Sequence, residues 1–499
     1  MTPHQRRNTF GLFIAGVIAL AALTGCEVGP NYKVPVQKMP TEWVSPPTTQ
    51  ASVTLQQPIE IQRWWTTFGD PTLDSLISRA VSYNLDLQAA TERVREARAS
   101  LGNAGSALFP TVDAVGAYTR SFNARGGSTV IAGAGGSVIT TSGPRPHDLW
   151  QAGFDATWEL DVFGGARRGV EAASDNLQAS IEDRRDVLVT LLAEVATDYI
   201  SLRGYQQEVV IAEENLVSQV HTADVTRTKV RGGFTTELDV ANADAQVATT
   251  RSQIAGFAML EQQTIYSLSV LLGQIPTALE RELAPREQIP IVPPTVPIGL
   301  PSELLRRRPD IRRSERQLAA ATANIGVATA QLFPQFSLTG TLTVQGSEFK
   351  ALGNLGNRLW SFGPSLTWPI FDAGHIWMNI EIENSLQAQA LIAYRNTVLL
   401  ALQDVENALV AYADEQQRRA ALADAVADNQ KAVKLATRRY DQGLTDFLNV
   451  LDAERSLYSS QDALVQSNRA VGTDLASLYK ALGGGWEIGE NAATQPVRN

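Results

Sequence analysis

Two long segments without proline place the strongest limit on how this chain can fold. Residues 165–231 and 373–441 contain no proline and almost no glycine, and their apolar residues recur at steps of four and three. This spacing is typical of helices that pack as coiled coils. At about 1.5 Å per residue, each segment would form a helix of roughly 100 Å. A helix of that length cannot be buried in a globular domain, so both segments are predicted to belong to an extended coiled coil.

Each long segment is followed by a glycine turn and a shorter helical segment. The first ends at Gly232-Gly233, and its returning helix reaches Leu272; the second ends at Gly443, and its returning helix reaches Leu482. Glycine commonly follows the end of a helix, because it adopts the left-handed backbone conformation without steric cost. The chain is therefore predicted to form two helical hairpins, with tips near 232–235 and 441–445.

The two hairpins belong to two copies of one duplicated unit. "NLDLQAATERV" at 84–94 lines up with "RPDIRRSERQL" at 308–318, an offset of 224. "GFTTELDVANA" at 233–243 lines up with "GLTDFLNVLDA" at 443–453, an offset of 210. The first copy therefore carries 14 extra residues, which fall between Pro110 and Trp158. That interval is rich in Gly, Ser and Thr, so the insertion is predicted to be a surface loop.

Alternating apolar and polar residues predict two strands in each copy. Every second residue from Trp150 to Val162 is apolar, and similar alternation occurs around Phe336 and Phe362. A period of two places the apolar side chains on one face of a strand. The same pattern could serve a soluble β-sandwich. The strands are predicted at about 111–122 and 148–162 in the first copy, and at about 335–349 and 359–372 in the second.

The two copies lie between shorter flanking segments. Trp64, Trp65 and Phe68 are interpreted as packing anchors of the segment before the first copy, and a proline-rich stretch between the copies is interpreted as an extended connector. The predicted parts are a signal peptide at 1–25, an N-terminal segment at 26–70, the first repeat at 71–273, the connector at 274–300, the second repeat at 301–483 and a C-terminal tail at 484–499.

Four strands cannot close a barrel in a membrane. Open sheet edges are not tolerated in lipid, and about eight strands is the smallest number in bacterial barrels. Three chains would supply twelve strands, and their long helices would pack alongside one another as a tube. The predicted fold class is therefore a mixed membrane protein, with four transmembrane strands and long helical hairpins in each chain of a trimer. A dimer with eight strands stays open as an alternative.

The only cysteine follows a short apolar run near the N-terminus. Arg6 and Arg7 precede apolar residues 10–23, a run too short to span a bilayer as a helix. Small residues before Cys26 match a bacterial lipobox, in which the cysteine is acylated and becomes the new N-terminus. Glu27 at the next position favours sorting to the outer membrane. The alternative is an ordinary signal peptide followed by an unused cysteine.

Composition and motif content argue against several other functions. The formal net charge is −10 and becomes more negative when Arg6 and Arg7 are removed, which argues against a nucleic-acid partner. The four histidines are far apart in the sequence, and no G-x-S-x-G, Walker A or H-E-x-x-H motif is present. We therefore expect no enzyme, no cofactor and no metal site. The arginines at 306–308 precede Pro309 and Asp310, a pattern typical of a helix start.

Four stretches of the chain resemble the TolC-type outer-membrane factors, specifically the lipoprotein branch related to NodT. They are "CEVGPNYKVP" from Cys26, "WWTTFGDPTLDSLI" from Trp64, "LLRRRPDIRRSERQL" from Leu304, and the paired tips ending in "LDVANA" and "LNVLDA". The resemblance covers essentially residues 26–485. It implies a trimer in the outer membrane of a Gram-negative bacterium, with a 12-stranded β-barrel, a 12-helix periplasmic α-barrel, and a lipid anchor on Cys26 (N-acyl and S-diacylglyceryl).

The resemblance also implies a function and partners. TolC-type factors are exit ducts of tripartite efflux systems, and they passively conduct small molecules from the periplasm to the exterior. Their partners are a periplasmic adaptor (a membrane fusion protein) and an inner-membrane pump of the resistance–nodulation–division class. Two alternatives remain: a structural coiled-coil lipoprotein without a conduit, and a type I protein-secretion duct.

The hairpin tips are predicted to form the surface that docks the adaptor. They are the only points where the long helices reverse, and they lie farthest from the strands. Their glycines also cap helices, which is the simpler explanation of why they are there. The predicted docking residues are Gly232, Gly233, Phe234, Thr235, Gly443, Leu444 and Thr445.

Polar residues next to each tip are predicted to form a periplasmic gate. The 210-residue offset places Asp239 opposite Asn449 and Asn242 opposite Asp452, and each copy carries its pair at i, i+3 on one helix face. A solvated helix face is the simpler interpretation. In TolC-type ducts the position matching Asp452 belongs to an acidic ring, and the tyrosine matching Tyr440 reaches the position matching Asp239. Asn449 departs from TolC, which has a second carboxylate there, so a weaker block by divalent cations is expected.

Overall fold

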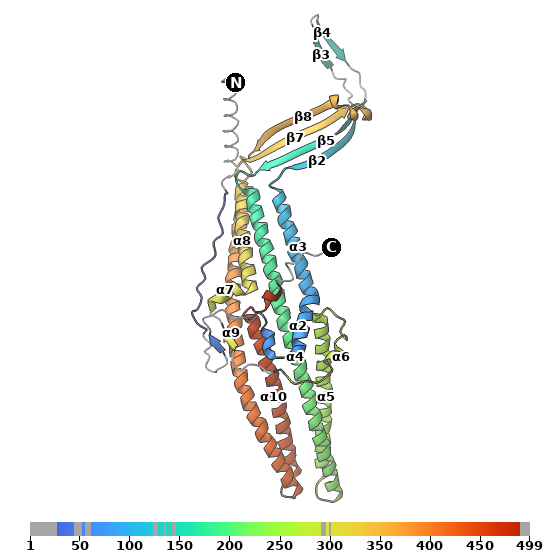
Figure 1. Ribbon diagram of the computed structural model, residues 1–499, viewed down its shortest axis with the longest axis vertical. Coiled ribbons are helices and arrows are strands. Elements are labelled where there is room, and N and C mark those ends of the chain that lie inside the picture. The colour runs from blue at the N-terminus through green and yellow to red at the C-terminus, as the bar shows by residue number, and fades with distance from the viewer. Residues whose placement is uncertain are drawn as a thin grey trace. The chain divides into compact units, whose positions relative to one another are not determined.

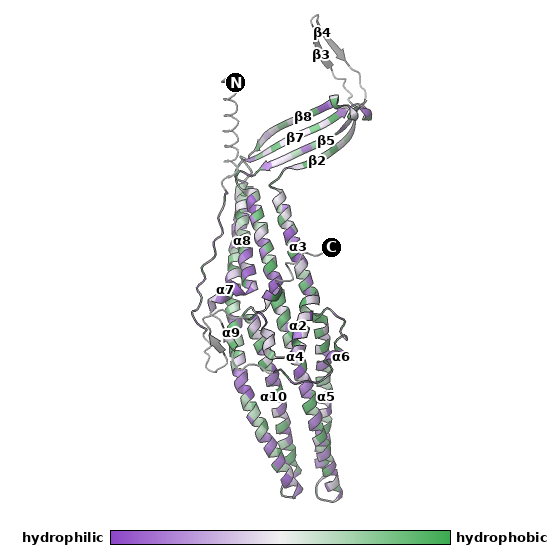
Figure 2. Cartoon of the chain, viewed as in Figure 1, coloured by the Kyte–Doolittle hydropathy of each residue, from purple (hydrophilic) through white to green (hydrophobic). Residues whose placement is uncertain are grey.

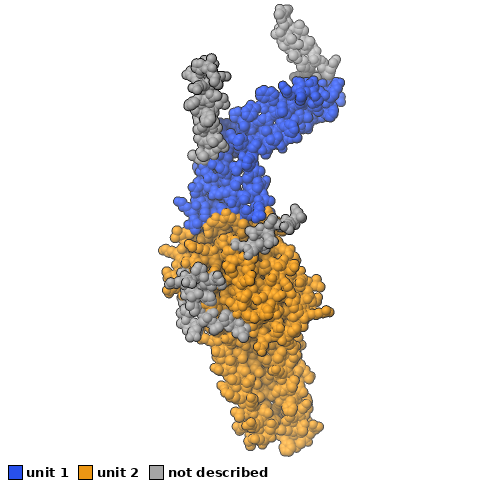
Figure 3. All heavy atoms as spheres, in the orientation of Figure 1, with its two compact units in different colours: residues 1–34, 96–177, 317–391 blue, residues 35–95, 178–316, 392–499 orange. Residues whose placement is uncertain are grey.

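The structure is a computed structural model that describes residues 27–43, 52–54, 61–122, 128–133, 136–141, 146–290, 296–298 and 301–489 (Figure 1). The predicted signal peptide and Cys26 lie outside these residues, as do the last residues of the C-terminal tail. The chain divides into two compact units (Figure 3). Unit 1 comprises residues 1–34, 96–177 and 317–391, and unit 2 comprises residues 35–95, 178–316 and 392–499.

Helices of equal length recur in the two copies. α3 and α8 have 22 residues each, α4 and α9 have 67, and α5 and α10 have 35. The predicted long helical hairpins are thus confirmed. The helices are α2 (Pro71–Tyr83), α3 (Leu85–Ser106), α4 (Gly165–Arg231), α5 (Glu237–Leu271), α6 (Glu280–Leu283), α7 (Leu304–Arg307), α8 (Pro309–Ala330), α9 (His375–Asp441) and α10 (Phe447–Ala481).

One antiparallel sheet in unit 1 joins the two copies. Its strands are β2 (Thr111–Phe122), β5 (Pro146–Leu160), β7 (Gln335–Gly346) and β8 (Arg358–Thr367), in the order β2-β5-β7-β8. β5 of the first copy pairs with β7 of the second, with Phe154 opposite Leu342. Among the strands that the structure describes, β2 and β8 each pair on one side only, so both edges of the sheet are open.

The strands of the second copy are shorter than predicted, and the insertion is not only a loop. β7 ends at Gly346 and is followed by short 3₁₀ turns, and β8 ends at Thr367, which pairs with Gln335, the first residue of its partner β7. The insertion contains a hairpin of β3 (Ser128–Gly133) and β4 (Gly136–Thr141). Its β-branched residues pair across the strands, Val130 with Ile139 and Ile131 with Val138, which explains why the segment forms strands.

The core of unit 2 forms where the N-terminal segment packs against helices of both copies. Trp64, Trp65 and Phe68 of a 3₁₀ turn (Trp64–Phe68) are buried, and the Trp64 ring stacks on Tyr479 of α10 at 5.1 Å between centroids. The interpretation of these residues as packing anchors is confirmed. β1 (Ser52–Thr54) of the same segment pairs in parallel with β6 (Val296–Ile298) of the connector.

The long helices carry polar and apolar residues interspersed along their length (Figure 2). Among the described residues, no helix is both long enough and apolar enough to cross a membrane.

A hydrogen bond recurs where the helical and strand parts of each copy meet. The indole Nε1 of Trp158 donates to the Leu108 carbonyl oxygen at 3.0 Å, and Nε1 of Trp368 donates to the Leu332 carbonyl oxygen at 3.0 Å. Each leucine belongs to an "LFP" triplet that ends the helical part of its copy. The duplication has therefore kept a bond that ties the end of one strand to the start of its partner.

We predict that Trp158→Phe and Trp368→Phe each lower the free energy of unfolding by about 1 kcal/mol, because phenylalanine keeps an aromatic ring while the indole hydrogen bond is lost. Thermal unfolding of the purified protein in detergent measures this loss. Trp360→Phe is the matched control, because Trp360 lies on β8 with its side chain exposed. An unchanged melting temperature in both junction variants would contradict the prediction.

Candidate functional site

The two hairpin tips close with the same backbone geometry. Gly233 and Gly443 adopt positive φ angles of 74° and 70°. The N–H of Phe234 donates to the Lys229 carbonyl at 2.9 Å, and the N–H of Leu444 donates to the Arg439 carbonyl at 2.9 Å. This pattern satisfies carbonyl groups that a helix end leaves unpaired, and it requires a residue in the left-handed conformation. The glycines predicted to cap the long helices therefore do so.

Apolar side chains project into solvent at matching positions of both tips. Phe234 and Leu238 are exposed at the first tip, and Leu444 and Leu448 are exposed at the second. The two pairs are related by the 210-residue offset, so the duplication has kept exposed apolar groups at both tips. Burying such groups against a partner is favourable, since it removes apolar area from water.

A cavity of about 1110 Å³ lies between the two tips. It brings together side chains from both hairpins, including Lys229 and Phe234 of the first and Phe447 and Leu448 of the second. Of the predicted docking residues, Gly232, Phe234, Thr235, Gly443 and Thr445 line this cavity. Of the predicted gate residues, Asp239 and Tyr440 line it.

Lys229 links the tips across this cavity. Its ammonium lies 3.4 Å from the centroid of the Tyr440 ring and donates a hydrogen bond of 2.9 Å to the Tyr440 carbonyl oxygen. The sequence marks Lys229 only as a basic residue in the last turn of a helix, where it also favours the helix dipole. Its partner, 211 residues away, could not be inferred from that position.

Asp239 and Tyr440 lie close together without a direct hydrogen bond between them in the described residues. The Asp239 carboxylate accepts bonds from the side chains of Thr235 and Thr236 and from the Thr236 N–H, forming a capping box at the start of α5. Partial burial opposes these bonds, but together they hold the pKa of Asp239 below its usual range. Burial raises the pKa of the Tyr440 hydroxyl, and the nearby Asp239 carboxylate adds to the effect.

The other predicted gate residues lie on the returning helices. Asp452 and Asn449 are exposed on α10, and the Asn449 side chain donates to the Thr445 hydroxyl at 2.8 Å. Asn242 is half-buried on α5. Within one chain, the structure therefore groups Asp239 with Tyr440 and leaves Asp452 directed to solvent.

Buried polar contacts join α4 to α10 above the tips. Thr222 donates to Glu454 at 3.1 Å, and the Asn215 amide donates to Gln461 at 3.1 Å. Farther along, Glu208 lies 3.7 Å from Arg469, and burial raises the pKa of Glu208 to about 7. The sequence analysis did not predict these contacts between α4 and α10. The signal that could have indicated them is an acidic residue, such as Glu208 or Glu454, at a position expected to pack between helices.

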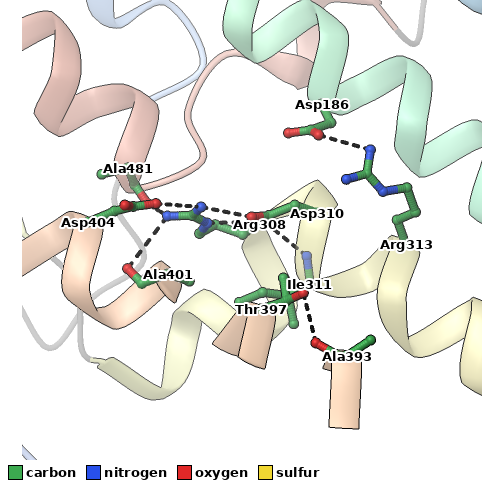
Figure 4. A network of polar contacts seen from close by, with 10 residues as sticks. All are labelled: Asp186, Arg308, Asp310, Ile311, Arg313, Ala393, Thr397, Ala401, Asp404 and Ala481. Carbon is green, nitrogen blue, oxygen red and sulfur yellow. Dashed lines mark hydrogen bonds and ion pairs between the residues drawn. The ribbon is translucent and has the colours of Figure 1, made fainter. Parts of the chain in front are cut away.

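Arg308 holds three elements of unit 2 together (Figure 4). Its guanidinium pairs with Asp310 at the start of α8 at 2.7 Å, and with Asp404 of α9 at 3.0 Å. It also donates to the carbonyl oxygen of Ala481, the last residue of α10, at 3.1 Å. α8 begins at Pro309, as the helix-start interpretation of this motif expects. The links to Asp404 and Ala481 could not be inferred from the motif.

We predict that Arg308→Ala destabilises the protein by about 3 kcal/mol or more, because it leaves the half-buried Asp310 carboxylate without its cation. Asp404→Asn is the matched control and should cost at most about 1 kcal/mol, since Asp404 is half exposed. Denaturant unfolding followed by circular dichroism measures both. Equal losses in the two variants would show that the buried pair is not the dominant contact.

Residues 76–274 and 300–484 match the family described as "Outer membrane efflux protein". The chain belongs to this family. The chain is 33% identical over 485 residues to the solvent efflux pump outer membrane protein SrpC of Pseudomonas putida, covering 95% of this chain and 98% of SrpC. It is 35% identical over 432 residues to the pyoverdine export outer membrane protein OpmQ of Pseudomonas aeruginosa, covering 86% and 88%.

Solved structures of outer-membrane channels share the fold. The chain aligns with OprN at a TM-score of 0.83 and 34% identity, covering 93% of this chain and 100% of that structure. It aligns with the open state of MtrE from Neisseria gonorrhoeae at a TM-score of 0.78 and 29% identity, covering 92% and 99%. The resemblance to TolC-type factors is confirmed, and this efflux protein acts in the outer membrane. Its relatives are channel proteins and not enzymes.

Proposed function

We propose that three copies of this outer membrane efflux protein close into one continuous duct. The main observation behind this proposal is the open sheet: among the described strands, β2 and β8 each leave one row of backbone N–H and C=O groups unpaired in a single chain. In lipid those groups must pair with another chain. Three four-stranded sheets make a barrel of twelve strands, and three pairs of helical hairpins make a tube of twelve helices.

An exposed apolar row on α9 supports the assembly. Met378, Ile382 and Leu386 are all exposed in the single chain, and they follow one another at steps of four, which places them on one helix face. A helix face of this kind is stable in water only when another surface covers it. A second copy of the chain would cover it at the same time as it pairs with the open sheet edge.

The duct would passively conduct small molecules from the periplasm, as one part of a tripartite system with a periplasmic adaptor and an inner-membrane pump of the resistance–nodulation–division class. The names of relatives as outer membrane proteins of solvent and toluene efflux pumps support this role. Acylation of Cys26 would add a second attachment to the outer membrane. The exposed apolar residues and the cavity at the hairpin tips are the proposed adaptor-docking surface.

We predict that Phe234→Asp combined with Leu444→Asp abolishes efflux, because a charge would have to be buried against the adaptor. Growth of a strain lacking its own duct, at increasing concentrations of a toxic efflux substrate, measures this loss. Leu355→Asp is the matched control, since Leu355 is equally exposed but lies in the turn before β8. Normal resistance in the double variant, with normal amounts of protein in the membrane, would reject the docking surface.

The gate proposal rests on the grouping of Lys229, Asp239 and Tyr440 between the tips. These contacts would hold the resting duct closed, and the adaptor and pump would open it by spreading the hairpins. In a trimer, three copies of Asp452 near the axis would favour cations. Asn449 in place of a second carboxylate would weaken block by divalent cations.

We predict that Tyr440→Phe combined with Asp239→Ala raises single-channel conductance in planar bilayers, and that Asp452→Ala reduces cation selectivity. Thr236→Ala is the control for fraying of α5, because it removes part of the capping box and keeps the Asp239 charge. Wild-type conductance in the double variant, with unaltered selectivity in Asp452→Ala, would reject the gate. A protein without measurable conductance would instead indicate a scaffold.

A further inference from the structure

The residues that follow Cys26 lie against α4 and α8 of unit 1. The N–H of Val28 donates to the Phe163 carbonyl oxygen at 3.2 Å, just before α4 begins. The Val28 carbonyl oxygen accepts from Nε of Arg168 at 3.2 Å, and Oδ1 of Asn31 accepts from Nη2 of Arg168 at 2.6 Å. One arginine therefore binds both the backbone and a side chain of the segment.

The Arg168 side chain is buried and held in position by a second partner on α4. Its side chain is 2% exposed, and Nη1 pairs with Glu171 one turn along α4 at 2.6 Å, which orients the guanidinium. A buried guanidinium is costly unless its donors are satisfied. Among the described residues, two of its three hydrogen-bond acceptors belong to residues 27–31, so losing the segment would leave donors of a buried arginine unsatisfied.

Two glycines allow the close approach of this segment to α8. A Cβ on Gly326 of α8 would lie 2.8 Å from Cγ of Arg168, and a Cβ on Gly29 would lie 2.5 Å from the Gly326 Cα. Gly29 also has a φ of 91°, which side chains rarely adopt. The backbone of the segment and that of α8 therefore touch directly, with Arg168 closing the contact.

We propose that the surface formed by Arg168 and Gly326 is a docking site for the mature N-terminal segment, and that it determines where the acyl chains of Cys26 enter the membrane. This inference rests on the proposed acylation. Cys26 stands two residues before Val28, so its Cα can lie at most about 7 Å from the Val28 Cα.

Without the docking site, the anchor would be held much farther along the chain. Met39 packs against the core of unit 2, 13 residues after Cys26. Because the effective concentration of a tethered group falls roughly as the −3/2 power of tether length, freeing the whole segment up to Met39 would lengthen the tether from two to 13 residues and lower that concentration on the order of tenfold. A freed anchor would also sample many points of the membrane surface instead of one.

The test compares Asn31→Ala with Asn31→Asp in the full protein. Alanine removes the acceptor for Arg168, whereas aspartate keeps it and adds a charge-assisted bond. A spin label on Lys33→Cys reports the motion of the segment, with the acylated Cys26 unavailable to the label. We expect an immobilised label in the parent and in Asn31→Asp, and nanosecond motion in Asn31→Ala and Gly326→Ala.

A photoreactive fatty acid, incorporated by growing cells, reports the position of the anchor. We expect cross-links from Cys26 to concentrate near residues 163–168 in the parent and in Asn31→Asp, and to spread over the protein in Asn31→Ala. Equal label mobility in Asn31→Ala and Asn31→Asp, or identical cross-link patterns, would overturn the docking site. If Cys26 takes up no fatty acid, the proposed acylation fails, and the label at position 33 in a Cys26→Ser background then decides whether residues 27–31 dock.

Discussion

The unpaired edges of the four-stranded sheet are the constraint on which the rest of this protein depends. β2 and β8 leave backbone groups open that water would satisfy and lipid would not. A chain that places this sheet in a membrane must pair the edges with other copies, and closure then dictates that the hairpins following the strands also meet around one axis. The apolar row on α9 is consistent with such a neighbour. The edge requirement thus connects the fold of one chain to the duct proposed for several.

Buried arginines join segments that are far apart in the sequence. Arg308 connects the start of α8 with α9 and the end of α10, and Arg168 connects residues 28 and 31 with α4. Arg203 of α4, with a side chain 2% exposed, binds Glu287 at 2.7 Å and the Pro285 carbonyl oxygen at 2.8 Å in the connector. A guanidinium suits this role because its five donors reach several acceptors in fixed directions. Irregular segments are thereby fastened to long helices.

Much of the fold could be predicted because its signals are local. The proline-free, heptad-patterned segments became helices of 67 residues, glycines ended them at the expected turns, and Pro309 began α8. The predictions failed where a local pattern had two solutions. A Gly-rich insertion is typical of a loop, yet its paired valines and isoleucines form β3 and β4. The apolar alternation continues at Trp368 and Ile370, but β8 ends at Thr367, where its partner β7 begins at Gln335, and 3₁₀ turns follow β7.

The candidate site, like the fold, could be predicted from the sequence only in part. The sequence by itself determined the tips and their glycines, and it matched Asp239 with Asn449 and Asn242 with Asp452. These features could be predicted because helical periodicity and duplication are visible in the order of the residues. Only the tertiary structure decided that Lys229 meets Tyr440, that Asp239 caps α5, and that Arg168 holds the residues after Cys26. These partners are separated by up to 211 positions. A contact over such a distance depends on how helices pack, which no local pattern of residues specifies.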